Sequence, residues 1–230
     1  MKTLGLIHGM SAVSTIDFYE QVNTRVNDAL GGNDSADMLL ASVNFGNVDR
    51  WVQVGDWDAL RTYLVQKATA LAAAGADFLA IGSNTGHIAA DAISQTVDLP
   101  LLHVGDAVAE EAITRGARTV GLLGNRVVTE LPFYRAKLES RGLDVLTPSS
   151  ADRDFAHRIV FDELSHGVFT EQSRNELIRI MRSLCAGGAD IIILGCTEYG
   201  LLVTDTDAPD IPRLDTNAVY IEAVAKAILD

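Results

Sequence analysis

Short apolar runs alternate with longer amphipathic stretches along this chain. Apolar runs of three to six residues are typical of strands buried in parallel sheets. The stretches between them carry apolar residues at helical spacing, and the alternation predicts β-α units that build parallel sheets. Predicted strands cover residues 3–7, 37–42, 78–81, 101–103, 119–123, 144–146 and 191–194, and predicted helices cover 15–29, 57–74, 105–115, 130–140, 151–165, 171–186 and 216–229.

Two segments of the first half recur in the second. Residues 75–83 read Gly-Ala-Asp-Phe-Leu-Ala-Ile-Gly-Ser, and residues 188–196 read Gly-Ala-Asp-Ile-Ile-Ile-Leu-Gly-Cys, an offset of 113. Thr-Leu-Gly-Leu-Ile at 3–7 recurs as Thr-Val-Gly-Leu-Leu at 119–123, an offset of 116. The repeat predicts two similar α/β lobes, each a mainly parallel sheet flanked by helices, related by a pseudo-two-fold axis with the site in the cleft between them. The first lobe is expected to cover 1–103 plus 212–230, and the second 104–211.

Charge and cysteine content indicate which classes of partner and which cellular compartment to expect. With 18 basic and 31 acidic residues the formal charge is −13, which disfavours nucleic acid and anionic membranes as partners. No apolar run approaches a membrane span, and the N-terminal run is too short for a signal peptide. Two cysteines, Cys185 and Cys196, favour a reducing cytoplasm over a disulfide framework. Neither a metal-ligand spacing nor a nucleotide-binding motif occurs, so we expect no metal and no cofactor.

Ser83 and Cys196 each follow a predicted strand and a glycine. Ligands of open parallel sheets bind beyond the carboxyl ends of the strands. If the lobes face each other, Ser83 and Cys196 lie on opposite sides of one cleft, as needed to act on both faces of one carbon. Hydroxyl, amide and backbone N–H groups in such turns suit a carboxylate ligand. The candidate binding residues are Gly9, Met10, Ser11, Asn84, Thr85, Thr197 and Glu198.

Three turns resemble the signature turns of the aspartate/glutamate racemases. They are Gly-Leu-Ile-His-Gly-Met-Ser-Ala-Val-Ser-Thr at 5–15, Gly-Ser-Asn-Thr-Gly-His at 82–87, and Leu-Gly-Cys-Thr-Glu at 194–198. The wider superfamily includes glutamate racemase, hydantoin racemase, maleate isomerase and arylmalonate decarboxylase. Segments 101–106, 121–124, 133–135 and 161–164 extend the resemblance over nearly the whole chain.

The resemblance implies a cofactor-independent racemase of aspartate and/or glutamate, and a homodimer. In such enzymes one residue removes the α-proton and a second returns a proton on the opposite face. Both are usually cysteines, and here Cys196 matches the second position, whereas Ser83 stands at the first. Gly82 stands where some relatives carry another cysteine, and His8 where the family has glycine. Relatives with a hydroxyl at the first position favour the L-enantiomer, so the resemblance implies an L-preference here.

The two candidate acid/base groups are chemically unequal. A free thiol has a pKa near 8.5, which we expect the polar turn to lower into a useful range for Cys196. Ser83 is far less acidic, so it would donate a proton or relay one through water or His87. Two alternatives remain open: a single-thiol decarboxylase or isomerase of small carboxylic acids, and a non-catalytic carboxylate-binding homologue. The partner in every case is a small acidic amino acid or dicarboxylate.

Several side chains have a structural interpretation beside the functional one. Arg50, in the predicted loop after the second strand, could bind the substrate's second carboxylate or be a solvated surface residue. Glu198 is expected to hold an ammonium group or tune the thiol. His8 is either a proton relay or a tolerated substitution. Ser83, Asn84 and Thr85 could instead cap turns, and structural roles are favoured for His87, His166 and Cys185.

Overall fold

The computed structural model describes all residues, 1–230, and the chain forms two compact units. Unit 1 comprises Met1–Val104 and Tyr220–Asp230, and unit 2 comprises Gly105–Val219. The second crossing between units thus lies inside the last helix, eight residues later than the boundary expected at 212. Residues 213–215 explain this difference, because they form a strand in the sheet of unit 2.

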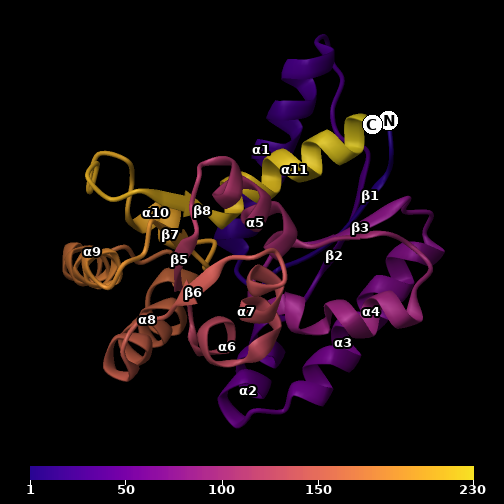
Figure 1. Ribbon diagram of the computed structural model, residues 1–230. Coiled ribbons are helices and arrows are strands. Elements are labelled where there is room, and N and C mark those ends of the chain that lie inside the picture. Colours follow the sequence, from indigo (N-terminus) through magenta and orange to yellow (C-terminus); the bar gives the residue numbers. More distant parts are fainter. The chain divides into compact units, whose positions relative to one another are not determined.

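Unit 1 is built on a parallel sheet with strand order β2-β1-β3-β4, of which β1, β2 and β3 are labelled in Figure 1. Its central strands β1 and β3 are buried along their whole length, as expected for a parallel sheet covered by helices. The strands are β1 (Leu4–His8), β2 (Met38–Ser42), β3 (Phe78–Ile81) and β4 (Leu101–Leu102). The helices are α1 (Ala12–Leu30), α2 (Phe45–Val54), α3 (Trp57–Ala73), the 3₁₀ helix Thr85–Ala89, α4 (Ala90–Thr96) and the later turns of α11 (Thr216–Leu229).

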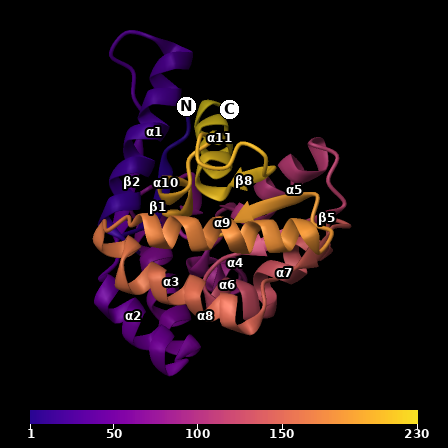
Figure 2. The same cartoon turned by 90° about the vertical axis from the view of Figure 1, so that its left-hand side faces the viewer.

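Unit 2 has a parallel sheet of the same kind, with strand order β6-β5-β7-β8. Its strands are β5 (Thr119–Leu123), β6 (Asp144–Leu146), β7 (Ile191–Leu194) and β8 (Arg213–Asp215). Its helices are α5 (Val104–Thr114), α6 (Arg126–Glu130), α7 (Pro132–Glu139), α8 (Ser150–Asp162), the 3₁₀ helix Leu164–His166, α9 (Glu171–Ala186) and α10 (Tyr199–Leu202). Figure 2 shows α8 and α9 side by side within this unit. The two sheets confirm the predicted α/β class and the equivalence of the repeated segments.

The repeated Gly-Ala-Asp segment performs the same task in each unit. The carboxylate of Asp77 accepts a hydrogen bond from the N–H of Thr3 at 2.7 Å, just before β1. The carboxylate of Asp190 accepts from the N–H groups of Arg118 and Thr119, both at 2.9 Å, where β5 begins. Each aspartate therefore fixes the start of its central strand, which explains why the segment recurs beside both β3 and β7.

The predicted helices are confirmed, except that a proline divides one of them. Several shorter elements were not predicted. The helix expected over 130–140 is divided, because Pro132 begins α7 and Leu131 before it adopts an extended backbone. The pattern missed the short helices α2, α4, α6 and α10 and the three-residue strand β8. Four of these five segments have seven residues or fewer, so each shows at most two periods of its pattern, whereas α2 has ten residues and was missed despite its length.

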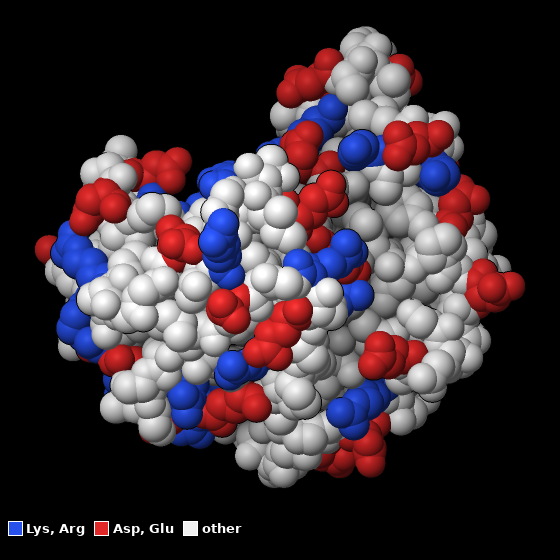
Figure 3. Space-filling model, viewed as in Figure 1, with Lys and Arg blue, Asp and Glu red and all other residues white.

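No helix of the structure has both the length and the apolar character required to span a bilayer. Acidic and basic side chains are interspersed over the face shown in Figure 3. The excess of acidic residues is therefore not gathered into one patch on that face.

Candidate active site

Cys196 lies just past β7, at the carboxyl end of the unit 2 sheet. The residue is 7% exposed, and its thiol donates a hydrogen bond to Oε2 of Glu198 at 3.1 Å. The hydroxyl of Thr197 donates to the same oxygen at 2.8 Å. Glu198 is itself 3% exposed. The thiol proton therefore points at a buried carboxylate that two consecutive neighbours hold in place.

The environment of Cys196 favours the protonated thiol. Burial raises the pKa of Cys196 well above its usual range, and the negative charge of Glu198 raises that pKa further. The expectation that the turn would lower the pKa of this thiol was wrong, because the turn buries the sulfur and the thiol donates its hydrogen bond to a carboxylate. Cys196 is thus a proton donor at rest, and it becomes a base only when Glu198 or another acceptor takes its proton.

Asp215, at the end of β8, is a further carboxylate beside this turn, and sequence reasoning missed it. Its Oδ1 accepts a hydrogen bond from the N–H of Asn217 at 2.8 Å. Its charge also raises the pKa of Cys196. A Cβ on Gly200 would lie 1.9 Å from its Oδ2, so a side chain at this position would require the carboxylate to move. The sequence offered only a weak signal, because Arg213 interrupts the apolar residues of Ile-Pro-Arg-Leu-Asp before this aspartate.

Ser83 occupies the matching position after β3 in unit 1. Its Oγ accepts a hydrogen bond from the N–H of Gly86 at 3.3 Å, so the hydroxyl also caps its own turn. The side chain is half-buried, and no acceptor lies within hydrogen-bond distance of its O–H. Asn84 and Thr85 are buried beside it, and the Asn84 side chain makes no capping hydrogen bond to the 3₁₀ helix.

His87 is held in one neutral form by its two ring nitrogens. Nδ1 lies 2.8 Å from the carbonyl oxygen of Ser83, which can only accept. Nε2 accepts a hydrogen bond from the N–H of Val104 at 3.1 Å. The ring therefore carries its hydrogen on Nδ1 and has a structural role. A proton relay through His87 would break one of these two hydrogen bonds.

The first turn of unit 1 brings Gly9, Met10 and Ser11 beside the Ser83 turn. The Met10 methyl lies 2.9 Å from where a Cβ on Gly86 would stand, so the two turns pack against each other. Ser11 caps α1 by accepting a hydrogen bond from the N–H of Ser14 at 3.1 Å. The 19-residue α1 therefore directs its positive N-terminal end at this edge of the sheet, where it would stabilise a bound carboxylate.

Arg50 lies on α2 rather than in the loop expected from the sequence. Its side chain is exposed, and Nη2 donates a hydrogen bond to Oδ1 of Asn47 at 3.0 Å. The structure shows no hydrogen bond from Arg50 to either turn of unit 1.

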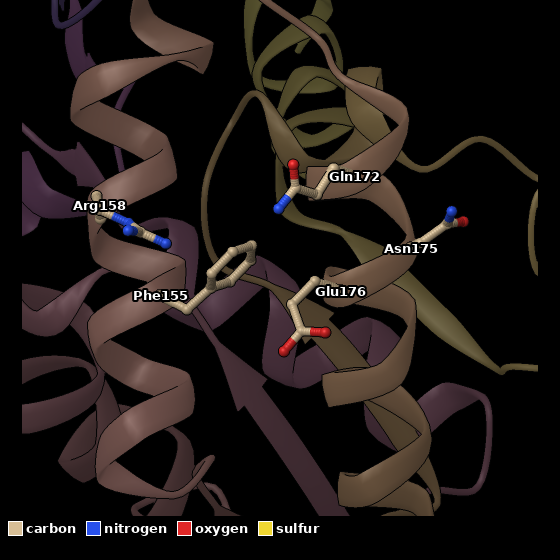
Figure 4. Close-up of a pocket in the computed structure, with 5 residues that line it drawn as sticks. All are labelled: Phe155, Arg158, Gln172, Asn175 and Glu176. Carbon is tan, nitrogen blue, oxygen red and sulfur yellow. The ribbon is translucent and has the colours of Figure 1, made fainter.

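A surface groove of about 500 Å³ separates α8 from α9 and contains none of the predicted site residues. Phe155 and Arg158 line it from α8 (Figure 4), together with Gln172, Asn175 and Glu176 from α9. No group of three or more His, Cys, Asp and Glu side chains is arranged to hold a metal ion.

We expect Glu198→Gln to increase the reactivity of the Cys196 thiol. Removing the carboxylate removes a negative charge that raises the pKa of Cys196, so more thiolate forms at a given pH. In a Cys185→Ala background, alkylation by iodoacetamide at pH 8 should be several-fold faster, because the lower pKa of Cys196 leaves more of the thiol ionised. Glu110→Gln, an exposed site, is the matched control. An unchanged or slower rate would show that Glu198 does not control the thiol.

Comparison with known proteins agrees with this arrangement. The profile of the Asp/Glu/hydantoin racemase family matches residues 7–224. A broad-specificity amino-acid racemase of Bacillus subtilis is 24% identical over 230 residues, covering 98% of each chain. The structure of a proposed Asp/Glu racemase from Yersinia pestis has a TM-score of 0.90 and 41% identity over 100% of both chains. That of an aspartate racemase homologue from Pyrococcus horikoshii has a TM-score of 0.80 and 28% identity, again over 100% of both. The chain thus belongs to the Asp/Glu/hydantoin racemase family and is an amino-acid racemase that does not depend on pyridoxal phosphate.

Proposed function

We propose that the protein racemises aspartate, glutamate or both, with Cys196 serving one face of Cα and Ser83 the other. The observation that carries the proposal is the hydrogen bond of 3.1 Å from the Cys196 thiol to Glu198. It supplies a carboxylate that can take the thiol proton at the moment when the thiolate is needed. The similarity to a broad-specificity amino-acid racemase of Bacillus subtilis and to an aspartate racemase homologue of Pyrococcus horikoshii supports an amino acid, and aspartate in particular, as substrate.

Proton transfers in the proposed reaction balance without a cofactor. Glu198 accepts the proton of Cys196, and the thiolate removes the Cα proton of the substrate. The resulting electron pair is delocalised into the substrate carboxylate. Ser83 donates its proton to the other face while it takes one from water, and Glu198 releases its proton to water, which restores both groups. In the reverse direction each group exchanges its role. We assign the substrate carboxylates to Gly9, Met10, Ser11, Asn84, Thr85 and Thr197, with Arg50 a candidate for the second carboxylate.

The unequal acid strengths of Cys196 and Ser83 could favour the L-enantiomer as substrate, but thermodynamics limits how such a preference can appear. The two enantiomers have the same free energy in water, so kcat/KM must be equal in the two directions. The unequal acid strengths of thiol and hydroxyl can therefore appear only as different kcat and KM values for the L- and D-forms. A cytoplasmic homodimer stays a prediction.

Incubation in D2O with each enantiomer of aspartate and glutamate tests the proposed function. We expect loss of the Cα proton signal in NMR spectra together with formation of the opposite enantiomer. The unequal acid/base groups also suit a second candidate, a single-thiol decarboxylase or isomerase of small carboxylic acids. Release of CO2 from a substituted malonate, or isomerisation of an unsaturated diacid, with no exchange at Cα of any of the four amino acids, would favour that candidate. Binding of dicarboxylates with no turnover of any of these compounds would favour a carboxylate-binding homologue.

A further inference from the structure

The parallel pairing of β3 with β4 ends one residue pair earlier than that of β7 with β8. In unit 2 the last pair of the register is Leu194 with Asp215. The register of unit 1 stops before the matching residues, Ile81 and His103. The two sheets have the same strand order otherwise. The strands of unit 1 therefore separate at their carboxyl ends, directly before the turn that contains Ser83.

The hydroxyl of Tyr220 takes the place of the first missing ladder hydrogen bond. Ladder bonds between parallel strands recur every two residues, and the N–H of Leu79 donates to the carbonyl oxygen of Pro100 at 2.8 Å. The N–H of Ile81 would therefore donate to the carbonyl oxygen of Leu102. It donates instead to the hydroxyl oxygen of Tyr220 at 3.2 Å. The Tyr220 hydroxyl donates to the carbonyl oxygen of Leu102 at 2.5 Å, so one phenol group bridges the separated strands.

The ring of His87 takes the place of the next ladder bond. By the same repeat, the N–H of Val104 would donate to the carbonyl oxygen of Ile81. It donates instead to Nε2 of His87 at 3.1 Å. The carbonyl oxygen of Ile81 accepts from the N–H of Ser83 at 2.8 Å. Nδ1 of His87 lies 2.8 Å from the carbonyl oxygen of Ser83, so this ring connects the end of β4 with the Ser83 turn.

Tyr220 and His87 form one buried wedge between β3 and β4. Their ring centroids lie 5.8 Å apart, and the two rings cross at 75°. Both residues are buried, and Phe18 packs against Tyr220 with centroids 6.1 Å apart. Burial raises the pKa of Tyr220 above its usual value, so the hydroxyl keeps the proton that it donates to Leu102. The wedge therefore has fixed hydrogen-bond directions and closely packed rings.

Unit 2 has no counterpart of this wedge. At the repeat offset of 113 the residue that matches His87 is Gly200. The registers relate β4 to β8 by an offset of 112, and at that offset the residue that matches Tyr220 is Val108. Neither side chain offers a hydrogen-bonding group. A longer ladder, as in unit 2, would pair the same backbone groups without burying a phenol and an imidazole. The wedge is thus specific to the unit whose turn holds a serine.

We propose that Tyr220 is a positioning residue for Ser83. It acts on the turn by two routes, because its hydroxyl fixes the N–H of Ile81 and its ring packs against His87, which fixes the carbonyl oxygen of Ser83. The inference rests on the proposed racemase reaction, in which Ser83 serves one face of Cα. The Ser83 hydroxyl must then lie within proton-transfer distance of that carbon, and a displacement of about 1 Å can cost about 100-fold in rate. Tyr220 itself exchanges no proton with the substrate.

The kinetic test is Tyr220→Phe, which keeps the ring and removes the bridge between Ile81 and Leu102. We expect kcat for racemisation to fall about tenfold with KM within about twofold of wild type. Cys196 alone can exchange the Cα proton, which is seen in D2O as deuterium incorporation without inversion. That exchange should change less than about threefold, because Tyr220 acts through Ser83. In a Ser83→Ala background, Tyr220→Phe should cause no further loss of racemisation.

Tyr63→Phe is the matched control. Tyr63 lies on α3 in the same unit, and its hydroxyl accepts a hydrogen bond from the N–H of Asn44 at 3.1 Å. The control therefore also removes one bond between a tyrosine hydroxyl and the backbone. We expect it to racemise within about twofold of wild type. A loss equal to that of Tyr220→Phe would overturn the positioning role, because any weakening of unit 1 would then have the same effect.

Amide hydrogen exchange followed by NMR tests the bridge without reference to activity. In Tyr220→Phe the amide of Ile81 should exchange at least about tenfold faster, whereas that of Leu79 should not change. If Tyr220→Phe does not fold, the wild type decides. A scalar coupling across the hydrogen bond must join the backbone nitrogen of Val104 to Nε2 of His87, and its absence refutes the wedge.

Two kinetic results would also overturn the role of Tyr220. One is racemisation by folded Tyr220→Phe within about twofold of wild type, and the other is an equal loss in the presence and absence of Ser83. Failure of the racemase proposal itself would appear differently, as no exchange by the wild type at Cα of any acidic amino acid.

Discussion

Cys196→Ser is expected to reduce racemisation of the preferred acidic amino acid about 1,000-fold. The substitution keeps the size of the side chain and its hydrogen-bonding capacity toward Glu198. It replaces a thiol with an alcohol that is far less acidic, so neither Glu198 nor water can generate the anion at a useful rate. Chiral chromatography of the amino acid over time measures the loss.

Cys185→Ser is the matched control for this substitution. Cys185 lies on α9 and is only partly buried, packed at the edge of the unit 2 core. We expect the racemisation rate of the Cys185→Ser variant to stay within about twofold of wild type, because substitutions away from the core and the active site have small effects. Thermal unfolding temperatures of both variants should stay close to that of wild type. Retained racemisation in a folded Cys196→Ser protein would remove Cys196 from the reaction.

The pattern of apolar residues was sufficient to predict both sheets because their central strands are continuous apolar runs. β3 and β7 are buried on every residue, and each follows the same Gly-Ala-Asp segment. β8 escaped prediction because it has only three residues, two of which, Arg213 and Asp215, are polar. Its strand character comes from pairing with β7, a long-range contact that a local pattern does not contain.

The candidate site shows the same division between local and tertiary information. Sequence placed Ser83 and Cys196 at strand ends, since position after an apolar run and a glycine is a local property. It misjudged the pKa of the Cys196 thiol, because burial and the orientation of Glu198 depend on the folded turn. The fit of His8 over Gly82 was also invisible, because these residues are 74 positions apart and meet only through the pairing of β1 with β3.

Gly82→Ala is expected to destabilise unit 1, and its cost should depend on His8. A new Cβ would stand 1.9 Å from Cδ2 of His8, well inside any normal contact. The imidazole cannot easily move, because Phe18 and Thr15 hold it. Overpacking at such a site costs about 2–3 kcal/mol. With His8→Gly the ring is gone, and the added methyl should cost less than about 1 kcal/mol, because alanine also restricts the unfolded chain.

Urea unfolding followed by tryptophan fluorescence measures this coupling. Both tryptophans, Trp51 and Trp57, lie in unit 1, so the signal reports the unit that contains the substitution. Gly5→Ala is the matched control, since its Cβ would lie 2.8 Å from the Cβ of Ala76, away from His8. The cost of Gly5→Ala should be the same with His8 and with His8→Gly, whereas that of Gly82→Ala should fall by about 2 kcal/mol. An equal cost of Gly82→Ala in both backgrounds would mean that the His8 ring does not occupy the space over Gly82.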